Sequence, residues 1–209
     1  MSIYWVALLS LIVFLSSWVV RLRRRLRFDD RGAIARKHTE FRSLIDAHEV
    51  FDNVIAEFSK TPGTKEIKVI AATGASLLPI IRKLLSTPGM SCITFRFAFA
   101  DPDFPEIDCA AAHWRQEVRV VTDQLAHMED EDRKVRFLWT YYRHLPTMHG
   151  IMFENEHLLL GFFRWVEKDG RRELSGAERP YLYIRKDDEL AGMFFDLFNS
   201  WFQRAWKDV

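Results

Sequence analysis

The sequence has few cysteines and almost no net charge. Cys92 and Cys109 are the two cysteines among 209 residues, and no C-x-x-C spacing occurs. We expect two buried free thiols in a reducing compartment, with a disulfide between them as the alternative. Thirty Lys and Arg balance 29 Asp and Glu. A general coat of positive charge is therefore absent, and nucleic acid is not an expected partner.

Metal-binding patterns are also lacking. The histidines, among them His113, His144 and His157, show no spacing of the His-x-x-x-His kind. Asp101 and Asp103 stand two residues apart in a proline-containing loop, which we interpret as a solvated loop, with a metal pair as the alternative. The sequence predicts no metal and no cofactor.

A long apolar run is present at the start of the chain. Residues 1–20 carry no charged side chain, and a helix of about 20 residues spans a hydrocarbon core of about 30 Å. No Lys or Arg precedes the run and it ends Trp18-Val19-Val20, which favours a transmembrane anchor over a cleaved signal peptide.

A basic block follows the apolar run at once. It consists of Arg21, Arg23, Arg24, Arg25 and Arg27. The positive-inside tendency then predicts a single-pass protein of the cell inner membrane with the rest of the chain in the cytoplasm. The block is primarily a topology signal, and attraction to anionic lipid is a second role that it allows.

Apolar residues then recur at helical spacing from Asp29 to Ser59. We expect one amphipathic helix that links the membrane to the domain. The predicted organisation is a transmembrane helix at 1–20, a basic juxtamembrane segment and linking helix at 21–60, and an α/β domain at 61–209.

The predicted domain opens with a strand–helix–strand unit. Residues 66–72 and 91–99 have the composition of strands, and a helix runs through residues 77–85 between them. A unit of this length predicts a parallel pair. The turn at Thr73 and Gly74 joins strand to helix, and such a turn can bind an anion on its free N–H groups. We favour simple turn chemistry, with the anion site as the alternative.

The remaining elements alternate in type. We expect a polar excursion at 164–173, a charged connector at 129–132, and core packing rather than membrane contact for the last helix. The predicted helices are 108–128 and 187–207, and the predicted strands are 135–142, a hairpin at 147–163, and 181–184.

The hairpin resembles the core of the phospholipase D-like fold. The segments that carry the resemblance are Pro146-Thr147-Met148-His149-Gly150, Leu160-Gly161-Phe162 and Phe198-x-x-Trp201-Phe202-x-x-x-Trp206. The order of elements from residue 65 to residue 207 looks like one half of a bacterial member with a degenerate site. The resemblance implies a mixed sheet flanked by helices.

The family pattern His-x-Lys-x-x-x-x-Asp places His149 at the histidine, Ile151 at the lysine and Glu156 at the aspartate. In active members the histidine attacks phosphorus, the lysine neutralises phosphoryl charge, and a second half or subunit completes the site. Only the histidine is retained here. Arg143 and Arg164 are nearby in sequence and offer partial compensation for the lysine.

These residues leave several functions open. The first hypothesis is a non-catalytic module that senses a small phosphorylated ligand or a protein partner through Thr73, Gly74, Arg143, His149 and Glu156. The second is a homodimeric phosphodiesterase, a phospholipase or nuclease, with His149 as nucleophile. A third is an effector that perturbs the membrane through its anchor. His149 also has a purely structural interpretation, as a histidine bonded to backbone at a strand start. In each case we expect membrane lipid around the anchor and self-association of the domain.

Overall fold

The computed structural model describes residues 39–41, 48–88, 90, 92–104, 113–131, 135–168, 170–176 and 181–207. The predicted membrane span at 1–20 and the arginine block lie outside these residues. Within the described part of the chain, no helix has the length and apolar character that a membrane crossing requires. The residues from Thr39 onward form one compact unit.

The unit is an α/β domain built on a mixed, seven-stranded sheet. The strand order is β1-β9-β6-β5-β2-β3-β4, in which β2, β3 and β4 are parallel and every other pair is antiparallel. The predicted parallel pair is therefore confirmed. The strands are β1 (Thr39–Phe41), β2 (Lys65–Ala71), β3 (Ile93–Ala100), β4 (Val135–Tyr142), β5 (Met148–Phe153), β6 (His157–Phe162) and β9 (Tyr181–Arg185).

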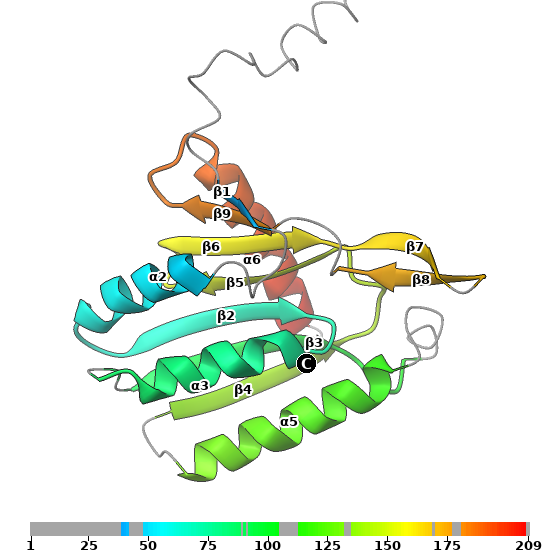
Figure 1. Cartoon of the computed structure of the whole chain (residues 1–209), viewed down its shortest axis with the longest axis horizontal. Helices are drawn as coiled ribbons and strands as arrows, with labels where there is room; N and C mark the ends of the chain where they lie inside the picture. The colour runs from blue at the N-terminus through cyan, green and yellow to red at the C-terminus, as the bar shows by residue number, and fades with distance from the viewer. Residues whose placement is uncertain are drawn as a thin grey trace, which may run out of the picture. The chain divides into compact units, whose positions relative to one another are not determined.

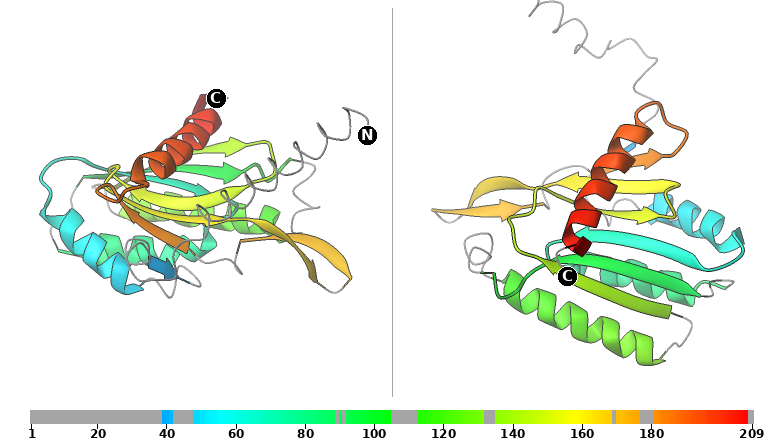
Figure 2. Two further views of the ribbon diagram at one scale, coloured as in Figure 1. Left: turned by 90° about the horizontal axis from the view of Figure 1, so that it is seen from above. Right: turned by 180° about the vertical axis from the view of Figure 1, so that it is seen from behind.

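Helices cover both faces of this sheet. α2 (His48–Lys60), η1 (Ala75–Leu77), α3 (Leu78–Ser86) and α5 (Trp114–Glu131) contribute to one apolar cluster, and α6 (Ala191–Lys207) contributes to the other. Figure 2 shows α6 against the face opposite α3 and α5. Because helices cover both faces, the side chains on both faces of the strands must be apolar. The near-continuous hydrophobic runs of the parallel strands meet this requirement.

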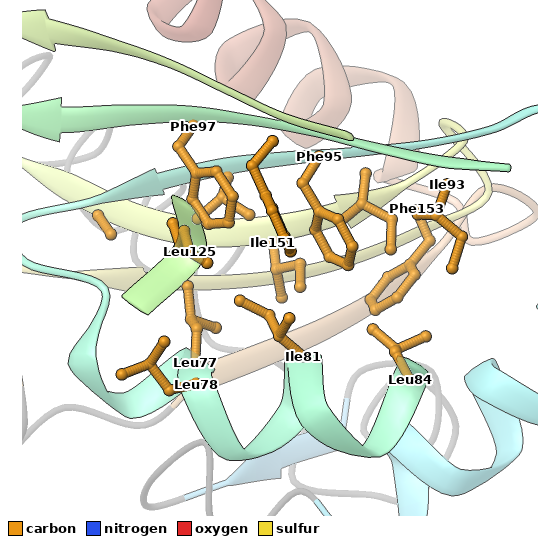
Figure 3. Packing of buried hydrophobic residues seen from close by; sticks show 14 of the residues in the cluster. Leu77, Leu78, Ile81, Leu84, Ile93, Phe95, Phe97, Leu125, Ile151 and Phe153 are labelled. Carbon is orange, nitrogen blue, oxygen red and sulfur yellow. The ribbon is translucent and has the colours of Figure 1, made fainter. Parts of the chain in front are cut away.

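Aromatic residues of β3 fill the first cluster. Phe95 and Phe97 are fully buried, and their rings stack at a centroid distance of 6.0 Å. Ile81 and Leu84 of α3 point toward them (Figure 3). Fully burying one such side chain stabilises the fold by about 1.5–3 kcal/mol.

The predicted polar excursion is a separate two-stranded sheet. β7 (Arg164–Lys168) pairs with β8 (Arg171–Ser175), and the turn between them includes Gly170 with a φ of 72°. Leu174 of β8 is buried in the apolar cluster on the α6 side of the sheet, so this hairpin packs against the domain.

The predicted helix from Asp29 to Ser59 is confirmed at residues 48–59, which lie in α2, and is wrong at residues 39–41. Residues 39–41 form β1, which pairs with β9, and α2 begins only at His48. Phe51 and Phe58 of α2 are buried in the core, so α2 belongs to the domain and is no free linker. The compact unit accordingly starts at Thr39 and not at residue 61. Helical spacing identified the apolar face of α2 but carried no signal for an edge strand upstream.

Two smaller expectations also change. Cys92 is an exposed free thiol with a φ of 56°, and not a buried one, because it lies in the turn that enters β3. Cys109 lies outside the described residues. α5 extends through Glu131, so three of the four residues predicted as a charged connector are helical.

Core packing of α6 is confirmed. Phe198 and Phe202 are buried, whereas Leu190 and Met193 are exposed. The buried face of the helix therefore excludes Met193.

Phe198→Ala should destabilise the domain by about 3–5 kcal/mol, because it leaves a cavity between α6 and the sheet. Met193→Ala is the matched control on the same helix and should change stability by less than about 0.5 kcal/mol. Urea unfolding of the two variants measures both values. Equal effects would show that α6 does not pack as described.

Candidate functional site

Most of the predicted site residues lie at the same end of the strands, although each has its own neighbours there. The parallel strands end there, and β5 begins there because it runs antiparallel to β2, with Ile70 opposite Gly150. The arrowhead of β2 lies on the side where β5 starts (Figure 1). The loops that follow β2 and β4 therefore lie at the same end of the sheet as the start of β5. The residues at this end are Thr73, Gly74, Arg143 and His149. Ligand sites commonly form at this edge of α/β sheets.

His149 lies in a row that crosses three strands. It pairs with Gly161 of β6, and the β6–β9 register, continued by one residue, places Gly161 beside Tyr181. A Cβ atom on Gly161 would overlap the imidazole. The missing side chain at Gly161 thus allows the ring of His149 to lie over β6 and reach Tyr181.

One ring nitrogen of half-buried His149 has a hydrogen-bond partner and the other is covered. Nδ1 lies 2.7 Å from the hydroxyl of Tyr181. Nε2 is buried and has no hydrogen-bond partner among the described residues. Phe163 packs on the ring at a centroid distance of 4.6 Å, and a Cβ on Gly176 would lie 3.0 Å from Nε2.

Burial has an electrostatic consequence for His149. It disfavours the charged imidazolium and lowers the pKa of His149 to about 4. The ring is therefore neutral at pH 7. Since the folded pKa lies below the ordinary value of 6.5, the stability that neutral His149 contributes is lost as the pH falls from about 6.5 toward about 4.

The turn after β2 has a structural explanation. Gly74 has a φ of 77°, and a Cβ there would lie 2.7 Å from Cε1 of Phe99. Thr73 Oγ1 accepts a hydrogen bond from the Ala75 N–H at 3.4 Å, so a side chain of the turn itself occupies one of the N–H groups that an anion would use. These contacts favour turn chemistry at Thr73 and Gly74.

The two remaining predicted ligand residues behave differently. Arg143 is exposed, and its Nε lies 3.0 Å from Oδ2 of Asp101 at the His149 edge. Glu156 lies at the opposite end of the hairpin, in the β5–β6 turn, and forms an ion pair with Lys186. The structure therefore does not bring Glu156 to His149. Ile151, which the phospholipase D-like resemblance aligns with a lysine, is fully buried in the core.

A hollow lies at the Glu156 end of the sheet. Its volume is about 450 Å³, and α2, the β5–β6 turn and the β9–α6 link form its walls. The residues that line it are Glu57, Phe58, Thr61, Phe153, Glu154, Glu156, His157, Arg185, Lys186 and Asp187.

His157 is the buried titratable group of this hollow. Its Nδ1 lies 2.9 Å from the hydroxyl of Tyr183, and its Nε2 lies 3.2 Å from a carboxylate oxygen of Glu57. A carboxylate only accepts, so neutral His157 carries its proton on Nε2 and accepts from Tyr183 at Nδ1. Burial lowers the pKa of His157, against an opposing effect of Glu57. Sequence reasoning missed this network because Glu57 and His157 are distant in the chain and no local spacing joins them.

Comparisons with known proteins identify no family. No family model and no curated protein matches the chain. Among solved structures, the chain is similar to TrmBL2, an archaeal chromatin protein whose structure is described as showing a novel mode of DNA binding. The identity is 10% over 93% of this chain and 68% of that chain, with a TM-score of 0.39. A likeness at this level carries no argument about fold or function.

Gly161→Ala should destabilise the domain by about 1–3 kcal/mol, because the new methyl group overlaps the His149 ring. In a His149→Ala background the same change should cost almost nothing, so the two effects are coupled. Chemical unfolding of the two single variants and the double variant measures the coupling.

Gly192→Ala is the control for the backbone effect of the substitution. Gly192 lies in α6 with open space around it and should gain about 0.5–1 kcal/mol from the better helix former. Additive effects of Gly161→Ala and His149→Ala would contradict the described row.

Proposed function

We propose that the chain is a non-catalytic binding module of the phospholipase D-like type, tethered to the inner membrane by residues 1–20 with its domain in the cytoplasm. The observation that carries the proposal is that one ring nitrogen of His149 is hydrogen-bonded within the domain and the other is covered. A nucleophilic histidine needs one ring nitrogen in contact with substrate, and here Nδ1 faces Tyr181 while Nε2 is buried between glycine backbones.

The electrostatics also favour a binding role over a phosphodiesterase. Phosphoryl transfer requires cationic groups that stabilise the developing negative charge, and removal of one such donor costs about a hundred- to a thousandfold in rate. The position aligned with the lysine holds buried Ile151, and Arg143 forms an ion pair with Asp101. The homodimeric phosphodiesterase is thus the less supported alternative.

The hollow beside His157 suits a small ligand. Its volume of about 450 Å³ lies in the range of small-molecule sites, about 300–1,000 Å³. Four carboxylates and two cationic side chains line it. The net negative charge of this lining disfavours a phosphorylated ligand in the hollow. Glu156 therefore contacts a ligand other than the small phosphorylated molecule expected from the sequence.

Self-association is part of the proposal. Confinement to a membrane plane raises the effective concentration of the domains and favours pairing. β5 and β6 are both interior strands, so their edges are already paired, and two His149 hairpins can meet only through the ends of their strands.

A phosphodiesterase assay tests the central part of the proposal. The full-length protein in detergent, supplied with a generic phosphodiester, single-stranded DNA or phospholipid, should show no hydrolysis above buffer, and His149→Ala should show the same. Tyr181→Phe is a matched control, since it keeps the aromatic ring at position 181 but removes the hydroxyl that binds Nδ1 of His149. Turnover by the wild type that disappears in His149→Ala would refute the non-catalytic assignment.

A further inference from the structure

Two cationic side chains lie directly opposite each other on the face of the sheet that packs against α6. Lys68 of β2 and Arg96 of β3 are register partners on adjacent parallel strands. Like charges in this arrangement repel each other. The exposed fractions of the two side chains are 17% and 33%, so solvent screens this repulsion only in part.

A single carboxylate serves both cations. Glu66 lies 3.3 Å from Nη1 of Arg96 and 3.6 Å from Nζ of Lys68. Lys68 also donates to the side-chain oxygen of Asn199 in α6 at 3.3 Å, which is a neutral acceptor. The cluster of Glu66, Lys68 and Arg96 therefore retains one uncompensated positive charge.

Aromatic residues of α6 hold Arg96 in place. The guanidinium carbon lies 4.2 Å from the ring centroid of Trp206 and 5.7 Å from that of Phe202. Such stacking fixes the plane of the guanidinium, in which Nη1 pairs with Glu66 and the other N–H groups can recognise an oxyanion.

Two hydrogen-bond donors in this cluster lack an acceptor. Nε of Arg96 and Nε1 of Trp206 are buried, and neither has a partner among the described residues. Both groups are donors only, so what is missing at each is an acceptor oxygen. A buried donor without a partner costs free energy and indicates a missing ion, water or ligand.

We propose that Lys68, Arg96 and Trp206 form a binding site for a phosphate group. An oxyanion there supplies the missing acceptor for two N–H groups and neutralises the uncompensated charge. Because both N–H groups are covered, an oxyanion that reaches them must displace the side-chain atoms that cover them. The site lies on the opposite face of the sheet from the His149 ring, so the proposal does not depend on the function proposed above.

Titration of the full-length protein in detergent with inorganic phosphate tests the site. Sodium chloride of equal ionic strength is the control, and calorimetry together with tryptophan fluorescence gives the dissociation constant. We expect saturable phosphate binding with a change in fluorescence, and no binding of chloride. Absence of saturable phosphate binding would overturn the proposal.

Matched variants assign the binding to these residues. Trp206→Phe keeps the aromatic stack but removes one donor to a charged acceptor, and should weaken phosphate binding about tenfold or more. Trp201→Phe, on the same helix, should bind as the wild type does. Arg96→Gln should abolish binding. If Arg96→Gln does not fold, Trp206→Phe still decides, and wild-type affinity in Trp206→Phe would overturn the proposal.

Two sources of the phosphate group are then distinguished in nanodiscs. If a phospholipid headgroup occupies the site, transfer from a maltoside detergent, which has no phosphate, into zwitterionic phosphatidylcholine discs should raise the apparent dissociation constant of inorganic phosphate. If the site serves a free phosphorylated molecule, the constant should be the same in detergent and in these discs, because neither surface carries net charge.

Discussion

Burial of both faces of one mixed sheet is the constraint on which the rest of this structure depends. The strands carry apolar side chains on each face, so helices must cover both. α3 and α5 do this by connecting the parallel strands, and α6 does it from the end of the chain. The clusters of polar side chains described above consequently lie at the two ends of the strands and beside α6, where its packing on the sheet leaves side chains partly exposed. The His149 row, the His157 hollow and the Lys68–Arg96 pair occupy these three places.

The His149 row shows how a polar side chain is accommodated on a sheet face by packing and one hydrogen bond. Gly161 gives the ring space to lie flat, Tyr181 binds one nitrogen, and the neighbouring glycines and Phe163 cover the other. The hydrogen bond orients the imidazole, and burial keeps it neutral. The same geometry engages Nδ1 of His149 and covers Nε2.

Sequence patterns predicted most of the fold because its signals are local. The parallel strands, the hairpin at 147–163 and the buried face of α6 follow from composition and spacing. β1 was missed because three residues at a sheet edge gain their structure from pairing with β9, which lies far along the chain. The motif grouped Glu156 with His149 although the hairpin separates them, since motif spacing is a property of the sequence and residues at the turn and at the strand start lie at opposite ends. The pairing of Glu57 with His157, and of Arg96 with Trp206, is likewise tertiary.

The central claim is that neighbouring residues cover the imidazole of His149 and that the imidazole is neutral. Nuclear magnetic resonance of protein labelled with ¹⁵N at histidine measures this most directly, since it reports the protonation of both ring nitrogens as the pH changes. The account predicts that the imidazole of His149 becomes protonated only near pH 4. A pKa for His149 close to the ordinary value of 6.5 would show that the ring is open to solvent and would contradict the account.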